Sequence, residues 1–248
     1  MKVLGIIPSR YGATRFPGKP LADIGGKTMV ERVYRQAIQA SCMTDVIVAT
    51  EDERIIQHVL GFGGKAMMTR ADHQTGTDRC AEVARMVEGY DIVVNIQGDE
   101  PFILPEQIDA AVQPLLNGQL TDISTLAKPI ENADDIFNPN MVKVVLDNRN
   151  CAMYFSRSPI PHLRGISLAD WFGRGVVFYK HIGLYAFRSA TIQEVTSLPP
   201  GIYEQAESLE QLRWLTNGYP IAVGMTDKET MGIDVPEDIE KAKAFLGR

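Results

Sequence analysis

The chain has 248 residues, of which 45% are hydrophobic and 23% charged, and its formal net charge is −6. These values are ordinary for a globular protein and allow one large domain with a sizeable core. The negative net charge argues against general nucleic-acid binding, because no broad basic face is expected. No apolar run suits a signal-peptide core or membrane insertion, and the three scattered cysteines predict reduced thiols in a cytoplasmic protein.

The first half of the chain alternates between strand-like and helix-like segments. Short apolar runs predict strands at Val3–Ile7, Asp45–Thr50, Lys65–Thr69 and Asp91–Gln97. Amphipathic segments between them predict helices at Thr28–Ala40, Glu53–Leu60 and Asp78–Glu88. This alternation implies right-handed crossovers, and therefore predicts an α/β, Rossmann-like fold whose mostly parallel sheet carries helices on both faces.

The second half has fewer helices between its strands. Strands are predicted at Ile123–Ala127, Val142–Asp147 and Val176–Phe187, which indicates a smaller mixed or antiparallel β insertion. The stretch Pro159–Gly175 is rich in proline, glycine and histidine and predicts a mobile loop. The remaining predicted elements are a helix near Glu207–Asn217, a strand at Ile221–Met225 and a final helix from Pro236.

A long cationic loop follows the first predicted strand. It carries Arg10, Arg15 and Lys19, and three prolines stiffen it. Loops at the carboxyl end of a first strand hold anionic ligands in α/β proteins, so we expect this one to bind the polyphosphate of a nucleotide. It is not a P-loop, because Pro20 follows Lys19 where a serine or threonine would contact magnesium.

Two carboxylates are candidates for a magnesium site that faces this loop. Asp99 follows the fourth predicted strand, although an acid that caps the helix after Pro105 explains it equally well. Asp234 also follows a strand and a glycine, but its spacing from Glu237 by itself favours a helix start signal. The loop at residues 72–77 suits recognition of the edge of a base, or is an ordinary loop with a helix N-cap.

Seven segments carry a more specific signal when they are taken together. They are Arg10-(x4)-Arg15-x-Pro-Gly-Lys19-Pro20, Asp72-His-Gln-Thr-Gly-Thr77, Asn95-Ile-Gln-Gly-Asp99-Glu-Pro101, Tyr154-Phe-Ser-Arg157, Lys180-His-Ile-Gly-Leu-Tyr185, Leu209-Glu-Gln-Leu-Arg213 and Gly232-Ile-Asp234-Val-Pro-Glu-Asp238. In this order they closely resemble the bacterial CMP-Kdo synthetases, which are 3-deoxy-manno-octulosonate (Kdo) cytidylyltransferases. The opening loop by itself would indicate only a sugar nucleotidyltransferase.

The resemblance implies a Mg²⁺-dependent enzyme in which the anomeric hydroxyl of Kdo attacks the α-phosphorus of CTP. The products are pyrophosphate and CMP-Kdo, the activated sugar of lipopolysaccharide biosynthesis. The implied catalytic residues are Arg10, Arg15 and Lys19. The implied nucleotide-binding residues are Pro8, Ser9, Arg10, Thr75, Gly76, Thr77 and Asp99, and the implied metal ligands are Asp99 and Asp234. The implied sugar-binding residues are Gln97, Arg157, His181, Tyr185, Glu210 and Gln211. Arg157 suits the Kdo carboxylate, because a guanidinium fork matches its planar oxygens.

The resemblance also implies one nucleotidyltransferase domain over residues 1–248. Residues 1–120 would mainly bind the nucleotide, and about 121–220 would mainly bind the sugar and form a homodimer, which light scattering would test. Two alternatives stay open: a cytidylyltransferase for 8-amino-Kdo or another acidic sugar, and a nucleotide-binding regulator without catalysis. The regulator is disfavoured, because a protein that only binds a nucleotide needs no second acid beside Asp99.

Overall fold

The chain divides into two compact units in a computed structural model that describes residues 1–12, 16–118 and 121–246. Unit 1 comprises residues 1–109, 186–196 and 229–248, and unit 2 comprises residues 110–185 and 197–228. The predicted assignment of residues 1–120 to the nucleotide and of about 121–220 to the sugar stays a prediction.

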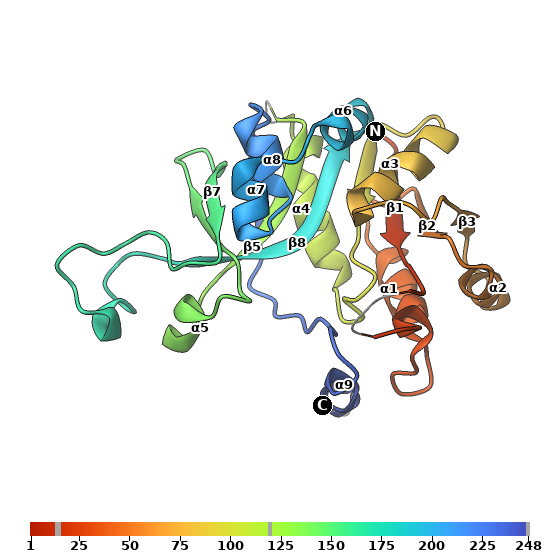
Figure 1. The fold of residues 1–248 in the computed structure, drawn as a ribbon, viewed down its shortest axis with the longest axis horizontal. Helices are drawn as coiled ribbons and strands as arrows, with labels where there is room; N and C mark the ends of the chain where they lie inside the picture. Colours follow the sequence, from red (N-terminus) through yellow and green to blue (C-terminus); the bar gives the residue numbers. More distant parts are fainter. Residues whose placement is uncertain (13–15, 119–120, 247–248) are drawn as a thin grey trace. The chain divides into compact units, whose positions relative to one another are not determined.

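Unit 1 is built on parallel strands in the order β3-β2-β1-β4 within the described residues (Figure 1). These strands are β1 (Val3–Pro8), β2 (Asp45–Thr50), β3 (Ala66–Met68) and β4 (Ile92–Asn95). Strand β1 has a neighbour on each side, and its Leu4, Ile6 and Ile7 are completely buried. Burial on both faces explains why the sequence of this strand is continuously apolar, and the predicted parallel arrangement is confirmed.

Helices alternate with these strands along the chain, as predicted. They are η1 (a 3₁₀ turn, Lys19–Leu21), α1 (Met29–Ala37), α2 (Glu53–Gly61), α3 (Gly76–Met86), α6 (Ser189–Ser197, mostly in this unit) and α9 (Asp238–Leu246). Side chains cap the first turns of α1 and α2, where Thr28 accepts from the Glu31 N–H and Asp52 from the Arg54 N–H. Figure 1 shows α2 beside β3, which it contacts.

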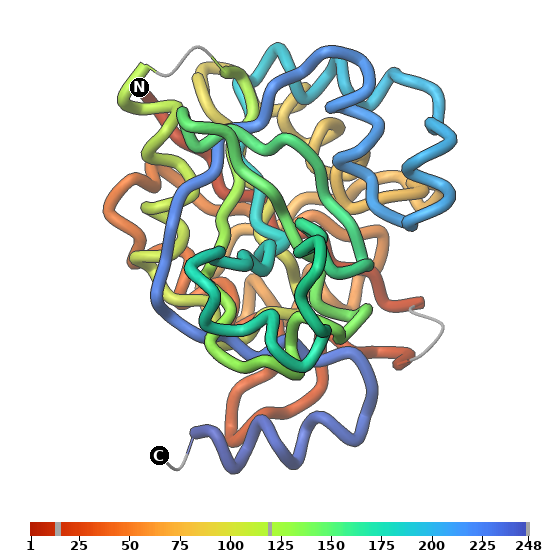
Figure 2. Tube along the Cα trace, turned by 90° about the vertical axis from the view of Figure 1, so that its left-hand side faces the viewer, coloured from red at the N-terminus to blue at the C-terminus, as the bar shows by residue number. Residues whose placement is uncertain are grey.

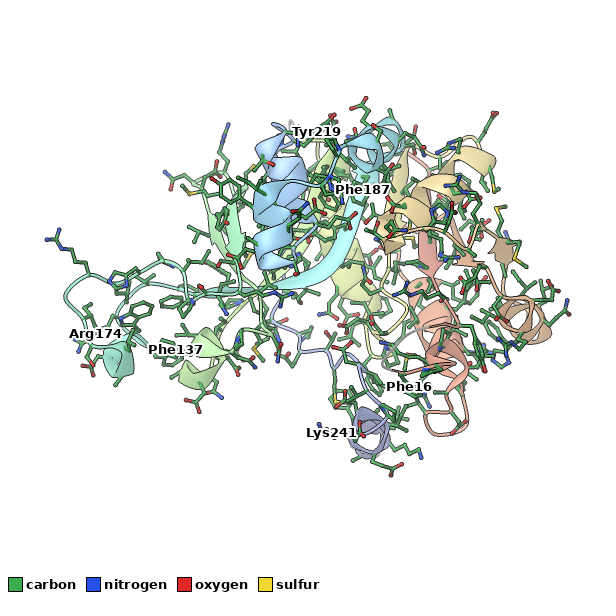
Figure 3. All side chains as sticks on the ribbon, in the orientation of Figure 1. Phe16, Phe137, Arg174, Phe187, Tyr219 and Lys241 are labelled. Carbon is green, nitrogen blue, oxygen red and sulfur yellow. The ribbon has the colours of Figure 1, made fainter. Side chains whose placement is uncertain are left out.

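The carboxyl-terminal helix α9 packs beside the segment that precedes α1 (Figure 2). Ile24, Phe102, Ile233 and Ala242 form one buried cluster there, and Phe16, labelled in Figure 3, packs against it. This cluster ties the end of the cationic loop to the segment that carries Asp234. Burial of apolar surface, rather than a local signal in the sequence, therefore places two distant parts of the expected site in one unit.

Unit 2 has a mixed set of strands. They are β5 (Ile123–Pro129), β6 (Lys143–Leu146), β7 (Ala152–Ser156), β8 (Tyr179–Arg188, of which residues 179–185 belong here) and β9 (Ile221–Met225). Strand β5 pairs with β9 in parallel, whereas β6 pairs with β7 and β8 antiparallel. The predicted mixed β insertion is confirmed.

The helices of unit 2 differ from the prediction at residues 207–217. They are α4 (Pro105–Leu116, mostly in this unit), α5 (Ala133–Phe137), η2 (Leu168–Asp170), α7 (Ile202–Glu207) and α8 (Gln211–Thr216). The helix predicted near Glu207–Asn217 corresponds to α8 but begins only at Gln211, because Ser208 adopts a left-handed conformation with φ of 52° and separates α7 from α8. The ion pair between Glu204 and Arg213, both largely buried, links the two short helices across the break.

The stretch predicted as a mobile loop, Pro159–Gly175, contributes to a second small core. Leu163 and Trp171 from this stretch are buried with Ile130, Ile136 and Phe178. Trp171 also contacts Phe137, which is labelled in Figure 3, at a ring distance of 5.9 Å. Frequent proline and glycine hid this packing, because such composition predicts turns whether or not they are covered.

Cys42, Cys80 and Cys151 are in the thiol form, and none of the described helices is long and apolar enough to cross a membrane. Burial, reinforced by the carboxylate of Asp109, raises the pKa of the Cys42 thiol well above its ordinary value. This thiol is therefore poorly reactive at neutral pH.

Lys143 is a fully buried cation that joins separate backbone segments of unit 2. Its Nζ donates to the carbonyl oxygens of Asn138, Met141 and Arg157 at 2.8, 2.6 and 2.7 Å. Burial, with a smaller effect from the charge of Arg157, lowers the pKa of this ammonium group. The three carbonyl contacts offset the loss of hydration and fix the backbone of Arg157.

We expect Lys143→Met to lower the free energy of unfolding by about 2 kcal/mol, because it leaves buried carbonyls without a donor. Urea denaturation measures this change. The exposed Lys228→Met in the same unit is the control and should change stability by less than about 0.5 kcal/mol. Equal stability of the two variants would contradict the assigned role of Lys143.

Candidate nucleotide site

A pocket of about 380 Å³ opens in unit 1 next to the carboxyl ends of β1 and β4. Its volume is in the range of small-ligand sites, and this end of a parallel sheet is where α/β proteins bind ligands. The predicted site residues that line it are Pro8, Ser9, Arg10, Lys19, Thr75, Gly76, Gln97, Asp99 and Asp234. The structure thus brings together the cationic loop, the 72–77 loop and both acids.

Among the predicted catalytic and nucleotide-binding residues that the structure describes, Thr77 is the one that does not contribute to this lining. Arg15 lies outside the described residues. Thr77 is 2% exposed, and its hydroxyl accepts from the side-chain amide of Asn95 at 3.3 Å within the core. Its assignment to the nucleotide stays a prediction.

Gly98 allows two walls of the pocket to approach each other at backbone distance. A Cβ at this position would lie 2.7 Å from the carbonyl oxygen of Pro8 and 3.1 Å from the Ser9 hydroxyl. Contacts that short do not occur between real side-chain carbons and backbone oxygens, so any larger residue would push the end of β1 away from the loop after β4. The glycine therefore sets the width of the pocket at this wall.

Lys19 and the two predicted metal ligands form one charged cluster. The Lys19 Nζ donates to Asp99 Oδ2 at 2.8 Å and lies 3.8 Å from Asp234 Oδ1. The side chain of Lys19 is 14% exposed, whereas those of Asp99 and Asp234 are 37% and 61% exposed. Two carboxylates therefore converge on a single cation at the open side of the pocket. Among the described residues, no group of three or more histidine, cysteine or acidic side chains is placed to hold a metal.

The helix-capping alternatives for these acids can now be compared with the structure. Helix α4 begins at Pro105, and the Leu104 N–H before it donates to the side chain of Gln107 at 3.0 Å. Asp99 lies six residues before that helix and contacts Lys19 instead. Asp234 likewise precedes α9 by four residues, and the carboxylate that accepts its backbone N–H belongs to Asp238. The structure thus places both acids at the pocket rather than at a helix start.

The 72–77 loop contains the predicted helix N-cap and also lies at the pocket, whereas recognition of a base edge by this loop stays a prediction. Thr75 is the N-cap of α3, and it exchanges reciprocal hydrogen bonds with Asp78 in a capping box. Thr75 and Gly76 also line the pocket. The cap holds the start of α3 in place, so that the loop presents a fixed surface to a ligand.

The structure also brings residues to the pocket that sequence reasoning did not assign. These are Phe16, Pro20, His73, Gln74, Arg79 and Gly98. Most belong to motifs already noted, whereas Arg79 faces the pocket from within α3. His73 contacts the carboxylate of Glu82, whose own burial would raise its pKa. Hydrogen bonds from His73 and from the Arg70 N–H outweigh that effect and hold the pKa of Glu82 below its ordinary value.

Unit 2 holds the other predicted sugar-binding residues, Arg157, His181, Tyr185, Glu210 and Gln211. The guanidinium of Arg157 donates to the carbonyl oxygens of Glu207 at 2.7 Å and of Pro139 at 3.1 Å. Tyr185 is buried, and burial together with the charge of Glu210 raises its pKa well above the ordinary value. His181 also contacts Tyr185 at a ring distance of 5.3 Å. His181, Tyr185 and Glu210 therefore share one region of this unit.

His181 is held as a neutral imidazole. Part of the residue reaches the surface, but its ring lies against Phe155 and Tyr185, and Nε2 is 2.9 Å from the Thr125 hydroxyl. Burial lowers its pKa to about 3. Thus, at neutral pH the ring acts as a hydrogen-bonding group and carries no charge.

Comparison with known sequences points to one class of enzyme. Residues 4–231 match the sequence model of the family described as Cytidylyltransferase. The 3-deoxy-manno-octulosonate cytidylyltransferase of Parabacteroides distasonis is 55% identical over 99% of this chain and 98% of its own length. The enzyme of the same name from Bacteroides thetaiotaomicron is 53% identical, with the same coverage of both chains.

Solved structures agree with the sequence comparison. A CMP:2-keto-3-deoxy-manno-octonic acid synthetase complexed with CTP is similar to this chain with a TM-score of 0.92 and 43% identity, over 100% of this chain and 99% of its own. The 4-diphosphocytidyl-2C-methyl-D-erythritol synthase of Anaerococcus prevotii has a TM-score of 0.65 at 16% identity, over 100% of this chain and 99% of its own. The second likeness supports the fold alone. The α/β nucleotidyltransferase fold predicted from the sequence is confirmed.

We expect His181 to make the protein less stable in mild acid. An unfolded histidine titrates near pH 6.5, so between that pH and about 3 only the unfolded state binds the proton. The free energy of unfolding therefore falls as the pH is lowered, by up to about 2 kcal/mol between pH 7 and pH 5. Urea denaturation at both pH values should show a smaller loss in His181→Gln than in the wild type. Identical losses would mean that His181 is not held neutral.

Proposed function

Because the chain belongs to the 3-deoxy-manno-octulosonate cytidylyltransferase family, we propose that it transfers CMP from CTP to the anomeric hydroxyl of Kdo. In this reaction the hydroxyl oxygen bonds to the α-phosphorus, the bond from that phosphorus to the bridging oxygen breaks, and pyrophosphate leaves. The observation that carries the proposal is the 55% identity to a named enzyme of this activity over almost the whole of both chains. The pocket with its charged cluster supports it from the structure.

The cationic loop would supply the electrostatic part of catalysis. The reaction asks little covalent chemistry of the protein, so positioning and charge stabilisation dominate. Arg10 and Lys19 line the pocket, and together with Arg15 they would hold the triphosphate and stabilise charge on the departing pyrophosphate. A net charge of −6 makes this local concentration of cations all the more significant.

The residues present fit a magnesium ion. Mg²⁺ in nucleotide sites is usually held by one or two carboxylates together with phosphate oxygens and water, and Asp99 and Asp234 converge on one cation. Bound there, it would neutralise phosphate charge and lower the pKa of the attacking hydroxyl. The chain's own contribution is to keep both carboxylates beside Lys19, at the open side of the pocket.

Lys19 competes with a metal for the same carboxylates in the free protein. We therefore expect Lys19→Met to bind Mn²⁺ several-fold more tightly than the wild type when no nucleotide is present, and to bind CTP more weakly. Electron paramagnetic resonance of free Mn²⁺ gives the first affinity, and calorimetry gives the second. Lys27→Met, at an exposed lysine of the same unit, is the control. Unchanged Mn²⁺ affinity in Lys19→Met would argue against Asp99 and Asp234 as metal ligands.

The proposed sugar contacts remain Gln97 of unit 1 and, separately, the five predicted residues of unit 2. The guanidinium of Arg157 is held by two carbonyl oxygens, and Lys143 holds its backbone. These contacts preorganise the guanidinium fork, which suits the Kdo carboxylate. Neutral His181 and Tyr185 would offer hydrogen bonds to sugar hydroxyls. Kdo is preferred to 8-amino-Kdo in this proposal because the relatives bear its name. A cytoplasmic homodimer that serves lipopolysaccharide biosynthesis is inferred from the resemblance.

Pyrophosphate release is the direct test of the proposed activity. Purified protein with CTP, Mg²⁺ and Kdo should release pyrophosphate at a rate that depends on all three. Asp99→Ala should abolish turnover, because it removes a metal ligand and the partner of Lys19. If neither Kdo nor 8-amino-Kdo triggers release, the proposed function is wrong, and normal turnover by Asp99→Ala would refute its role.

A further inference from the structure

Tyr11, in the middle of the cationic loop, is held from three sides. Its backbone N–H donates to Glu51 Oε1 at 3.0 Å, and its carbonyl oxygen accepts from the Gly18 N–H at 2.8 Å. The guanidinium carbon of Arg54 lies 3.4 Å from the centre of its ring. We call these four residues, Tyr11, Gly18, Glu51 and Arg54, the clasp. It lies entirely in unit 1.

Gly18 lets the clasp close. Its φ of +74° is in the left-handed region, and a Cβ there would lie 3.2 Å from the ring of Tyr11. The bond between Gly18 and Tyr11 brings the two ends of residues 12–17 together. That segment includes Arg15, while Arg10 and Lys19 adjoin the clasp on either side. The positions of Arg10 and Lys19 therefore depend on where Tyr11 is held.

Glu51 and Arg54 are themselves fixed by the rigid part of the unit. Glu51 directly follows β2, and its Oε2 lies 2.8 Å from Nη2 of Arg79, whose side chain is only 4% exposed. Arg79 also donates to the Thr69 hydroxyl and lines the pocket. Arg54 makes a two-pronged contact with Asp52 through Nε at 2.9 Å and Nη2 at 2.6 Å. A chain of charged contacts thus connects the loop to β2, α2 and α3.

From this geometry we propose that Glu51 and Arg54 are positioning residues for the triphosphate of CTP. They hold the two ends of the loop segment, at Tyr11 and Gly18, in place before the nucleotide arrives, so that less conformational entropy is lost when it binds. Neither residue is among those that line the pocket. That CTP is the ligand rests on the proposed function, whereas the clasp itself is defined by contacts of the free protein.

The test compares Glu51→Ala and Arg54→Ala with Glu53→Ala. Glu53 is an exposed glutamate two residues from Glu51 that contacts Gln57 and not the loop. A hydrogen bond to a charged group accounts for about tenfold or more in an equilibrium constant, and an exposed cation–π contact for roughly two- to fivefold. We therefore expect the CTP dissociation constant, measured by calorimetry, to rise about tenfold in Glu51→Ala and roughly two- to fivefold in Arg54→Ala. The KM for Kdo should stay at the wild-type value in all three variants. The CTP affinity of Glu53→Ala should also match that of the wild type.

A second measurement uses no ligand. Trypsin should cleave the Arg10–Tyr11 and Arg15–Phe16 bonds faster in Glu51→Ala than in Glu53→Ala, at a temperature where both remain folded. Glu51→Gln keeps an oxygen that can accept from the Tyr11 N–H, so it should recover most of the CTP affinity. Glu51→Ala leaves the buried Arg79 without its carboxylate and could fail to fold. In that case the CTP affinities of Arg54→Ala and Glu51→Gln decide the question.

Two results would overturn the proposal. One is a CTP affinity in Glu51→Ala and Arg54→Ala that matches Glu53→Ala. The other is an equal loss of CTP and Kdo affinity that follows the loss of thermal stability, because this pattern marks a merely structural role. If the wild type does not bind CTP, the proposed function fails, and the cleavage rates then decide whether the clasp positions the loop.

Discussion

The parallel pairing of β1 with β2 and β4 is the constraint on which unit 1 and its pocket depend. In this register Pro8 pairs with Ala49, and Ile6 with Asn95, so the three strands end at the same edge. The cationic loop, Glu51 and the segment up to Asp99 all start from that edge. Strand pairing therefore supplies the positions, and the loops supply the chemistry. The absence of a side chain at residue 98 lets the first and third of these segments meet at backbone distance.

Two of the cations that line the pocket are paired with carboxylates before any ligand arrives. Lys19 contacts Asp99, and Arg79 contacts Glu51, so these cations already have a carboxylate beside them. Binding a triphosphate with its metal would then exchange one set of ionic contacts for another. Exchange of this kind favours specificity more than affinity, since the pairs that are lost offset the pairs that are formed. A competing ligand with no charge or a single charge could not replace the ion pairs of Lys19 and Arg79 that its binding would break.

The apolar pattern of the sequence predicted the bounds of β1 and β2 to within one residue, because a buried parallel strand has a continuous apolar run. Periodicity was less accurate at the start of the helix predicted near Glu207–Asn217, where the left-handed Ser208 ends α7 and α8 begins only at Gln211. Motifs located most of the pocket lining, since loops that carry function keep local signatures. Arg79 was missed because its role appears only when folding brings Glu51 to it. The motif did not reveal that Thr77 is buried and accepts a hydrogen bond from Asn95 within the core.

The hydrogen bond between the Gly18 N–H and the Tyr11 carbonyl oxygen fixes the distance between the two ends of the segment that these residues enclose. Arg10 and Lys19 adjoin those ends in the sequence, so the same bond limits how far apart the two cations can move. Phe16, inside the segment, packs against the buried cluster of Ile24, Phe102, Ile233 and Ala242 and also lines the pocket. The segment is thus anchored both at its ends and at Phe16, so its length is constrained, and an insertion or deletion there would disturb the pocket lining together with the packing of α9.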